Sequence, residues 1–255
     1  MSTLNTQAAA LVIGAGERQG IGGAVAALVA KQGLHLFLAG RTEEKIGRLA
    51  DLIRAEGGDV TTVVVDSTRA DDIQSLFAQI AASGLPLRFM LYNTGRNLPA
   101  LLMDSTDRMI EGHWRRCVYG GALAGQAAVR LMQQQSDTDY GRGTIIYTGA
   151  SASMRGKPMF AAFAAAKAGA RMMAQSMARE FGPQGIHVGH VVIDGLVNGA
   201  VVRSIGPLGK LLVRTKGDGG ALLPDEVAKS IFTLHQQPKT AWTHELDLRP
   251  YKEVF

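Results

Sequence analysis

The chain has 255 residues, of which 46% are hydrophobic and 19% charged, and its net charge is +5 at pH 7. A single cysteine excludes an internal disulfide framework, and the N-terminus lacks the basic and apolar regions of a signal peptide. The basic residues are scattered rather than gathered in a stripe, and no apolar run is long enough to span a membrane. We therefore expect one cytoplasmic domain over residues 1–255, with no nucleic-acid or membrane partner.

Short apolar runs rich in branched residues alternate with longer helical patterns along the chain. This alternation predicts a Rossmann-type α/β fold, with a doubly wound, mostly parallel sheet of seven strands and helices on both faces. The predicted strands are Ala9 to Ile13, His35 to Ala39, Val60 to Val65, Phe89 to Tyr92, Thr144 to Tyr147, Val188 to Ile193 and Glu245 to Leu248.

Two predicted helices and one long connection stand out between these strands. The helix from Thr42 to Ala55 has a threonine at its cap position and acidic residues in its first turn. The helix from Phe160 to Phe181 is apolar or small-sided almost all round, so both of its faces must be covered. Residues 195–223 form a glycine-broken, loop-like stretch, and such a stretch after a late strand commonly forms a substrate lid.

The first strand runs directly into a cluster of glycines, and a helical pattern follows at once. Glycines there allow a tight turn and let backbone N–H groups approach a pyrophosphate at the helix N-terminus. Three residues separate Gly16 from Gly20, so the spacing departs from the ordinary G-x-G-x-x-G pattern. A merely flexible turn is the alternative, but the order of strand, glycines and helix favours a dinucleotide site. The predicted cofactor contacts in this loop are Gly14, Gly16, Arg18, Gln19, Gly20 and Ile21.

The end of the second strand indicates which dinucleotide binds. An NAD enzyme places an acidic residue there to hold the ribose 2′-hydroxyl, whereas this chain has Arg41. A guanidinium group fits a 2′-phosphate, and Arg18 in the glycine loop is a candidate second contact. The alternative is that Arg41 is a solvated residue at a strand end. The pattern favours NADP(H) over NAD.

Further motifs appear in a definite order along the chain. Asp66-Ser67 ends the third strand, Asn93-Thr94-Gly95 follows the fourth, and Ile193-Asp194-Gly195 follows the sixth. In this order the chain resembles the short-chain dehydrogenase/reductase family over its whole length. The resemblance implies an oxidoreductase with a small-molecule substrate, and Asp194 stands where the family has proline. The cofactor residues that it implies outside the glycine loop are Arg41, Asp66, Ser67, Asn93, Gly95, Lys167, Ile193 and Gly195.

The resemblance breaks at the proton donor. In the family a tyrosine exchanges the proton, a lysine four residues later lowers its pKa and binds the nicotinamide ribose, and a serine polarises the carbonyl. Lys167 is retained, but Phe163 stands at the tyrosine position and Ala150 at the serine position. The asparagine of the family's water relay aligns with Cys117, and the tyrosine position of the enoyl-reductase branch is Phe160.

Nearby hydroxyl groups are candidates to replace the missing acid. Ser151 and Ser153 closely follow Ala150, whereas the position of Tyr147 on its strand argues that its side chain faces the opposite side. The alternative is that the two serines only cap the turn after the fifth strand. The predicted catalytic residues are therefore Lys167, Ser151 and Ser153, and the histidine spacing predicts no metal site.

Two functions remain open from the sequence. The first is a reductase that uses NADPH on an activated C=C, C=N or carbonyl group, for which little acid catalysis is needed. The second is an NADP-binding sensor or structural protein with little or no catalytic activity. The resemblance does not choose between them.

Charge and small residues give two further expectations. Residues 199–217 carry Arg203, Lys210, Arg214 and Lys216 and no acid, which favours an anionic substrate unless the segment is simply solvated. The small residues 120–125 and the apolar helix over residues 160–181 resemble surfaces that this family buries between subunits. We therefore predict a homodimer or homotetramer.

Overall fold

A computed structural model describes residues 8–95 and 97–253, so residues 1–7, 96 and 254–255 of the predicted domain lie outside the described part. Seven strands form one sheet in the order β3-β2-β1-β4-β5-β6-β7, and every pairing is parallel. The predicted fold class is confirmed, with the correction that this sheet is entirely parallel. The strands are β1 (Ala9–Ile13), β2 (His35–Gly40), β3 (Val60–Val64), β4 (Leu87–Tyr92), β5 (Gly143–Thr148), β6 (Ile186–Ile193) and β7 (Glu245–Leu248).

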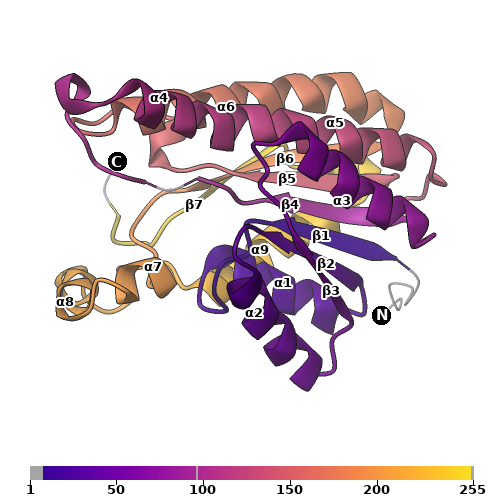
Figure 1. Cartoon of the computed structure of the whole chain (residues 1–255), viewed down its shortest axis with the longest axis horizontal. Helices are drawn as coiled ribbons and strands as arrows, with labels where there is room; N and C mark the ends of the chain where they lie inside the picture. Colours follow the sequence, from indigo (N-terminus) through magenta and orange to yellow (C-terminus); the bar gives the residue numbers. More distant parts are fainter. Residues whose placement is uncertain (1–7, 96, 254–255) are drawn as a thin grey trace.

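Helices cover both faces of the sheet (Figure 1). One face is covered by α1 (Ile21–Lys31), α2 (Glu43–Ala55) and α9 (Pro224–His235). The opposite face is covered by α3 (Ala70–Ala82), α5 (Gly120–Gln133) and α6 (Ala161–Phe181), and α4 (Asp107–Trp114) packs against α6. The strand order reverses between β1 and β4, and ligands of such sheets bind at the carboxyl ends of the strands beside this point.

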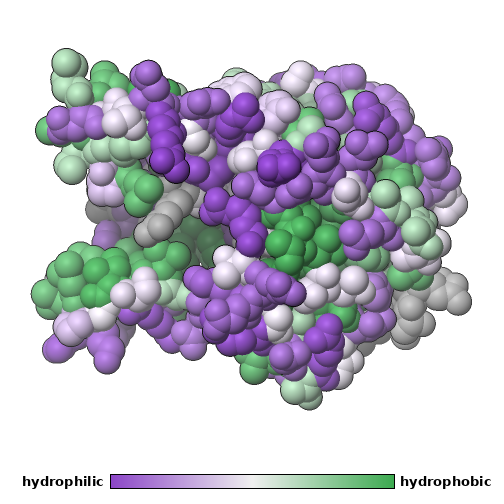
Figure 2. Space-filling view, viewed as in Figure 1, coloured by the Kyte–Doolittle hydropathy of each residue, from purple (hydrophilic) through white to green (hydrophobic). Residues whose placement is uncertain are grey.

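The stretch predicted as one long loop contains two helices, α7 (Ala200–Arg203) and α8 (Pro207–Thr215). The prediction of a loop was wrong because most glycines of this stretch lie outside the helices, and Gly209 inside α8 gives the close contact of α8 with Val202 of α7. Gly199 and Gly206 precede α7 and α8, and Pro207 occupies a first-turn position that needs no N–H. The two helices project beside the sheet, and their surface in Figure 2 is largely apolar.

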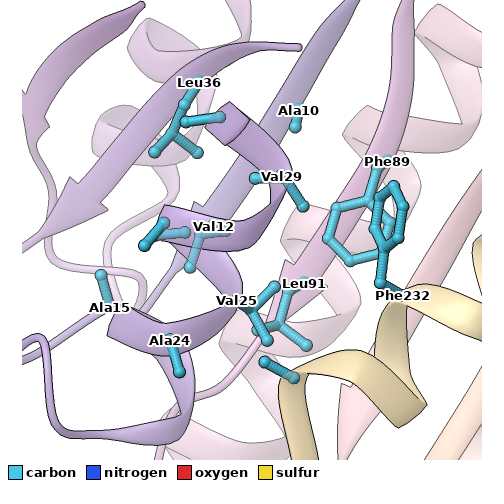
Figure 3. Close-up of a cluster of buried hydrophobic side chains, with 14 of the residues drawn as sticks. Ala10, Val12, Ala15, Ala24, Val25, Val29, Leu36, Phe89, Leu91 and Phe232 are labelled. Carbon is cyan, nitrogen blue, oxygen red and sulfur yellow. The ribbon is translucent and has the colours of Figure 1, made fainter. Parts of the chain in front are cut away.

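One part of the core lies between α1, α9 and the centre of the sheet (Figure 3). Val25 and Val29 of α1 are fully buried, and the small residue Ala24 lets this helix lie close to the strands. Phe89 of β4 meets Phe232 of α9 edge to face, with ring centroids 6.3 Å apart. Each fully buried side chain of this size contributes roughly 1.5–3 kcal/mol, so the core holds the carboxyl ends of the central strands in fixed register.

A buried histidine makes the fold sensitive to acid. His235 at the end of α9 hydrogen-bonds the Thr144 hydroxyl at 3.0 Å. Burial, with the nearby His187 and Arg88, lowers the pKa of His235 to about 4. The unfolded chain keeps a pKa near 6.5, so it binds more protons between these two values, and stability falls as the pH drops through this window.

We expect His235→Gln to lose about 3 kcal/mol less stability than the wild type between pH 7 and pH 4. Glutamine keeps a group that can bond Thr144 but has no proton to gain. Urea unfolding at both pH values measures the difference. His190, whose pKa burial also lowers to about 4, is unchanged in the variant, so part of the acid sensitivity persists. An identical pH dependence in both proteins would show that His235 is not responsible.

Candidate active site

A cleft of about 370 Å³ lies at the carboxyl ends of the strands on both sides of the reversal point. It gathers residues from the turns after β1, β2, β3 and β4 and from the segment between α4 and α5. Six of the predicted cofactor residues line this one cleft, although they are far apart in the sequence. The lining residues are Ile13, Gly14, Gly40, Arg41, Val65, Asp66, Ser67, Asn93, Thr94, Gly95, Leu98 and Arg116.

The glycine loop leads into the N-terminus of α1, directly after Gly20. Among the described residues, no side chain caps α1 and its first turn has no acidic residue, whereas α2, α3 and α9 each carry two acids there. The first backbone N–H groups of a helix lack helical partners, so this terminus fits the negative charge of a pyrophosphate. Asn93 holds the loop in place, because its Nδ2 donates to the Gly14 carbonyl at 2.9 Å.

Arg41 is exposed at the edge of the cleft, opposite the end of β3. Burial alone would raise the pKa of Asp66, but hydrogen bonds from Thr68 and the charge of Arg41 outweigh it and hold this pKa below its ordinary value. Arg18 donates to Asp225 of α9 at 2.9 Å, so its expected contact with a 2′-phosphate stays a prediction. Gln19 faces α7 and accepts a hydrogen bond from Arg203 at 2.9 Å.

Lys167 lies in the second turn of α6 with only 6% of its surface exposed. Its Nζ donates to the Thr148 carbonyl at 2.8 Å and to the Thr94 carbonyl at 3.1 Å, which anchors it at the ends of β5 and β4. Burial lowers the pKa of Lys167, and the nearby Cys117 opposes the shift. Gly95 has a φ of +126°, and a Cβ there would lie 3.3 Å from Nζ, so glycine leaves the room that the lysine occupies.

The two aromatic residues near this lysine have different surroundings. The Phe163 ring is buried, and its centroid lies 5.9 Å from the Lys167 Nζ. The His113 ring packs against Phe163 with centroids 5.7 Å apart. The Tyr147 hydroxyl donates to the Gly121 carbonyl of α5 at 3.0 Å, and burial raises the pKa of Tyr147 well above its usual range. The Tyr147 hydroxyl thus points toward α5.

The two predicted serines lie in the 3-10 turn after β5 and have different partners. Ser153 is buried, and its Oγ accepts a hydrogen bond from the Ala150 N–H at 3.1 Å, so it caps the turn. The Ser151 side chain lies near the carboxylate of Asp194, which is only 1% exposed, and helps to lower its pKa. Arg155 donates to both oxygens of this carboxylate, at 2.9 and 3.1 Å.

The contact of Arg155 with Asp194, which joins the turns after β5 and β6, was not predicted from the sequence. Burial would raise the pKa of Asp194, but Ser151 and Arg155 outweigh it and keep this pKa below its ordinary value. The available signal was an acid at a position where the family has proline. Asp194 also fixes the guanidinium group of Arg155.

A π-helical segment, η2 (Arg115–Tyr119), joins α4 to α5 and places Cys117 beside the lysine. A Cβ on Gly95 would lie 3.1 Å from the Cys117 sulfur and 3.3 Å from the Lys167 Nζ, so the thiol and the ammonium group share one side of that glycine. The hydroxyls of Tyr92 and Thr94 both donate to the Arg116 carbonyl, at 2.7 and 2.6 Å. These bonds satisfy a carbonyl in the irregular turn and fix its position.

Two general features complete the description of residues 8–95 and 97–253. Within these ranges no helix is long and apolar enough to cross a membrane. The same residues contain no group of three or more His, Cys, Asp or Glu side chains placed to hold a metal ion.

A parallel sheet that reverses beside a glycine loop, with a buried lysine at the ends of its central strands, defines a dinucleotide-binding α/β protein of the Rossmann type. Residues 8–208 match the short chain dehydrogenase family. The chain belongs to this family and is an oxidoreductase of its type, and members of the family use NAD(P)(H) and act on small molecules.

Known proteins resemble the chain over almost its whole length. A short-chain dehydrogenase from Rhodopseudomonas palustris is 34% identical, with a TM-score of 0.79, and the match covers 96% of this chain and 99% of that one. An uncharacterized oxidoreductase of Staphylococcus aureus is 26% identical over 254 residues, which covers 97% of this chain and 99% of that protein. The NADPH-bound structure of a Pseudomonas aeruginosa short chain oxidoreductase containing an atypical catalytic center is 22% identical, with a TM-score of 0.83 and 95% of each chain covered. The last likeness shows the fold alone.

Proposed function

We propose that the protein is an NADP(H)-dependent oxidoreductase with an atypical active site, which reduces an activated C=C, C=N or carbonyl group of a small substrate. The observation that carries this proposal is the buried Lys167, anchored by two carbonyls next to a cleft that is lined by Gly14 of the glycine loop and by Arg41. A buried ammonium group is costly to maintain, so its retention here favours a functional role.

Each group of the cofactor has a candidate partner in or beside the cleft. The uncapped N-terminus of α1 would hold the pyrophosphate, and Arg41 would hold the 2′-phosphate. Asp66 and Ser67 would contact the adenine, and Lys167 the nicotinamide ribose. When bound, NADPH supplies the hydride. The Pseudomonas aeruginosa neighbour, which shares the fold, has NADPH bound. The remaining proposed contacts are Gly14, Gly16, Arg18, Gln19, Gly20, Ile21, Asn93, Gly95, Ile193 and Gly195.

We further propose that the family's usual acid is absent. Phe163 stands four residues before Lys167 and has no proton to donate, and Ala150 has no hydroxyl. Ser151 is the first candidate to replace it, because its side chain is partly exposed whereas Ser153 is buried. Ser153 is the second candidate, although its Oγ is engaged by the Ala150 N–H. A substrate that accepts hydride before it is protonated would suit such a site.

We propose that residues 1–255 form one cytoplasmic cofactor-binding domain, in which residues 195–223 act as a substrate lid. One basic residue of the lid is neutralised, because Lys216 pairs with Glu253 at 2.9 Å. Among the described residues, Arg203 bonds only the uncharged side chains of Asn198 and Gln19. An anionic group on the substrate therefore stays a prediction that depends on Arg203, Lys210 and Arg214.

A second candidate is an NADP-binding sensor or structural protein, which the pair Ala150 and Phe163 favours. A panel of ketones, enones and imines, tested with NADPH at high enzyme concentration, separates the two. Stoichiometric oxidation of NADPH together with a reduced product supports the oxidoreductase. Tight NADPH binding with no turnover of any compound in the panel would favour the sensor instead.

Cofactor preference depends mainly on Arg41. A charge-assisted bond to the 2′-phosphate contributes about 1.5–3 kcal/mol, so NADPH should bind at least about tenfold tighter than NADH. In Arg41→Ala this preference should nearly disappear, whereas NADH affinity should change little. Calorimetric titration with both cofactors measures the ratio, and Arg48→Ala on the exposed side of α2 is a matched control. A preference that survives in Arg41→Ala would assign the 2′-phosphate to another group.

We predict a homodimer or homotetramer. A hollow of about 430 Å³ lies between α4 and α6, and its lining is mainly apolar. An apolar surface of this kind on a helical face is typical of a subunit contact. Sedimentation at micromolar concentration should give a multiple of 27.1 kDa, and a monomer would refute the prediction. The lining residues are Asp107, Ile110, Glu111, Trp114, Ala162, Ala165 and Ala166.

A further inference from the structure

The helices α7 and α8 expose an unusual amount of apolar side-chain surface. Leu208, Leu211 and Leu212 follow the i, i+3, i+4 spacing of one side of the helix. Lys210 and Arg214 are four residues apart and lie on another side of it. In Figure 2 this apolar surface borders a recess on the side where the strands end. We call it the α7–α8 face, and its members with their exposed fractions are Val201 (75%), Ile205 (48%), Leu208 (55%), Leu211 (55%) and Leu212 (40%).

A second apolar surface lies in the segment between β4 and α4. We call it the 98–103 wall, and its members are Leu98 (39% exposed), Leu101 (54%), Leu102 (62%) and Met103 (93%). Leu98 also lines the cofactor cleft. The Ala100 N–H donates to the Met159 carbonyl at 2.8 Å, which fastens this wall to the segment that leads into α6 and Lys167.

The α7–α8 face is likewise fastened to the cofactor site. The Ala200 N–H donates to the Gln19 carbonyl of the glycine loop at 3.0 Å, and Arg203 donates to the Gln19 side chain. A Cβ on Gly209 would lie 1.8 Å from the Val202 carbonyl, so α8 packs directly on α7 and the two helices form one surface. The 98–103 wall therefore continues from the cleft through Leu98, and the α7–α8 face is continuous with the glycine loop through Gln19.

From this continuity we propose that the substrate carries an extended apolar chain, which packs between the α7–α8 face and the 98–103 wall. Burial of that chain would remove from water the leucine and methionine surface that the free protein exposes. The nine residues of α8 span about 13 Å, which suits a chain of medium length rather than a small head group. The proposal rests on the proposed function, because it names the substrate class of the same site.

Equilibrium binding tests the proposal without requiring catalysis. The probe is cis-parinaric acid, a fluorescent polyene fatty acid, displaced from the NADPH-loaded protein by straight-chain alcohols of four, eight and twelve carbons. Affinity for the alcohols should rise about two- to fourfold per added methylene group, since each buried CH₂ contributes to transfer from water. Affinity that does not depend on chain length would overturn the proposal.

Two exposed positions provide the variants. Leu211→Gln on the α7–α8 face and Leu101→Gln on the 98–103 wall should each weaken binding of the twelve-carbon alcohol at least about fivefold. Thr215→Ala, an exposed uncharged position at the end of the same helix, should leave it unchanged. If Leu211→Gln alters sedimentation but not alcohol binding, the face is a contact between copies of the chain and the proposal is wrong.

Rates with enones of four, eight and twelve carbons separate this proposal from the proposed function. Chain-length-dependent binding without reduction of any enone supports the apolar site and contradicts the oxidoreductase. Reduction of the four-carbon and twelve-carbon enones with equal kcat/KM supports the oxidoreductase and contradicts the apolar site.

Discussion

Replacing Lys167 with methionine is expected to reduce the NADPH-dependent rate by about 100-fold or more. Lys167 is the one charged side chain that we place against the nicotinamide ribose, and the loss of one preorganised donor in an active site commonly costs 10²–10³ in rate. Methionine keeps much of the length and apolar volume of the lysine stem. Single-turnover oxidation of NADPH, with the compound of the panel that reacts fastest, measures the effect. Lys157→Met, in the exposed segment before α6, should leave the rate unchanged.

The pH dependence of stability is also expected to differ between the wild type and Lys167→Met. The unfolded chain keeps the ordinary, higher pKa of lysine, so it binds more protons than the folded protein between the two pKa values. Stability of the wild type should therefore rise as the pH increases through this window, and Lys167→Met should remove that rise. A variant that folds, binds NADPH and reacts at the wild-type rate would contradict the role that we assign to Lys167.

The double substitution Ala150→Ser, Phe163→Tyr is expected to create carbonyl reductase activity that the wild type lacks. Reduction of a simple ketone develops alkoxide charge that must be protonated in place, and neither Ala150 nor Phe163 carries a proton to give. The new tyrosine would stand one helical turn before Lys167, whose charge lowers the pKa of a nearby hydroxyl. The gain in ketone reduction is expected to be limited, because Cys117 stands where the family has the asparagine of its water relay.

Both proteins are assayed side by side on ketones with NADPH. Each single substitution serves as the matched control, because one hydroxyl without the other should give a smaller gain. Rapid ketone reduction by the wild type would show that Ser151 or Ser153 is already an efficient acid. In that case Ser151→Ala and Ser153→Ala identify which of the two it is.

The sequence predicted the central strands well because they are buried on both faces and are short continuous runs of apolar residues. The predicted bounds of the buried strand β1 agree with the structure, as do those of the edge strand β7, whose residues are only partly buried. Strand ends were less certain, since Gly143 and Thr148 extend β5 through backbone hydrogen bonds that side-chain patterns do not record. The helices α7 and α8 were missed because the segment was interpreted from its glycines and its charges. Its leucines at helical spacing were the available signal.

The sequence predicted only those parts of the candidate site that follow from the position of a residue directly after a strand. The turns after β1 to β4 must meet at one edge of a parallel sheet, so Gly14, Arg41 and Asn93 could be assigned to one site from their positions after strands. The sequence gives no comparable signal for which side chains from two different turns will pair with each other. The pairing of Arg155 with Asp194 and that of Arg18 with Asp225 depend on tertiary packing over long sequence separations.

The most direct test of the account is a crystal structure of the protein with NADP⁺. We predict the pyrophosphate at the N-terminus of α1, the 2′-phosphate within about 3.2 Å of the Arg41 guanidinium, and the nicotinamide ribose within hydrogen-bonding distance of the Lys167 Nζ. A 2′-phosphate directed away from Arg41, or a nicotinamide ribose out of reach of Lys167, would contradict it.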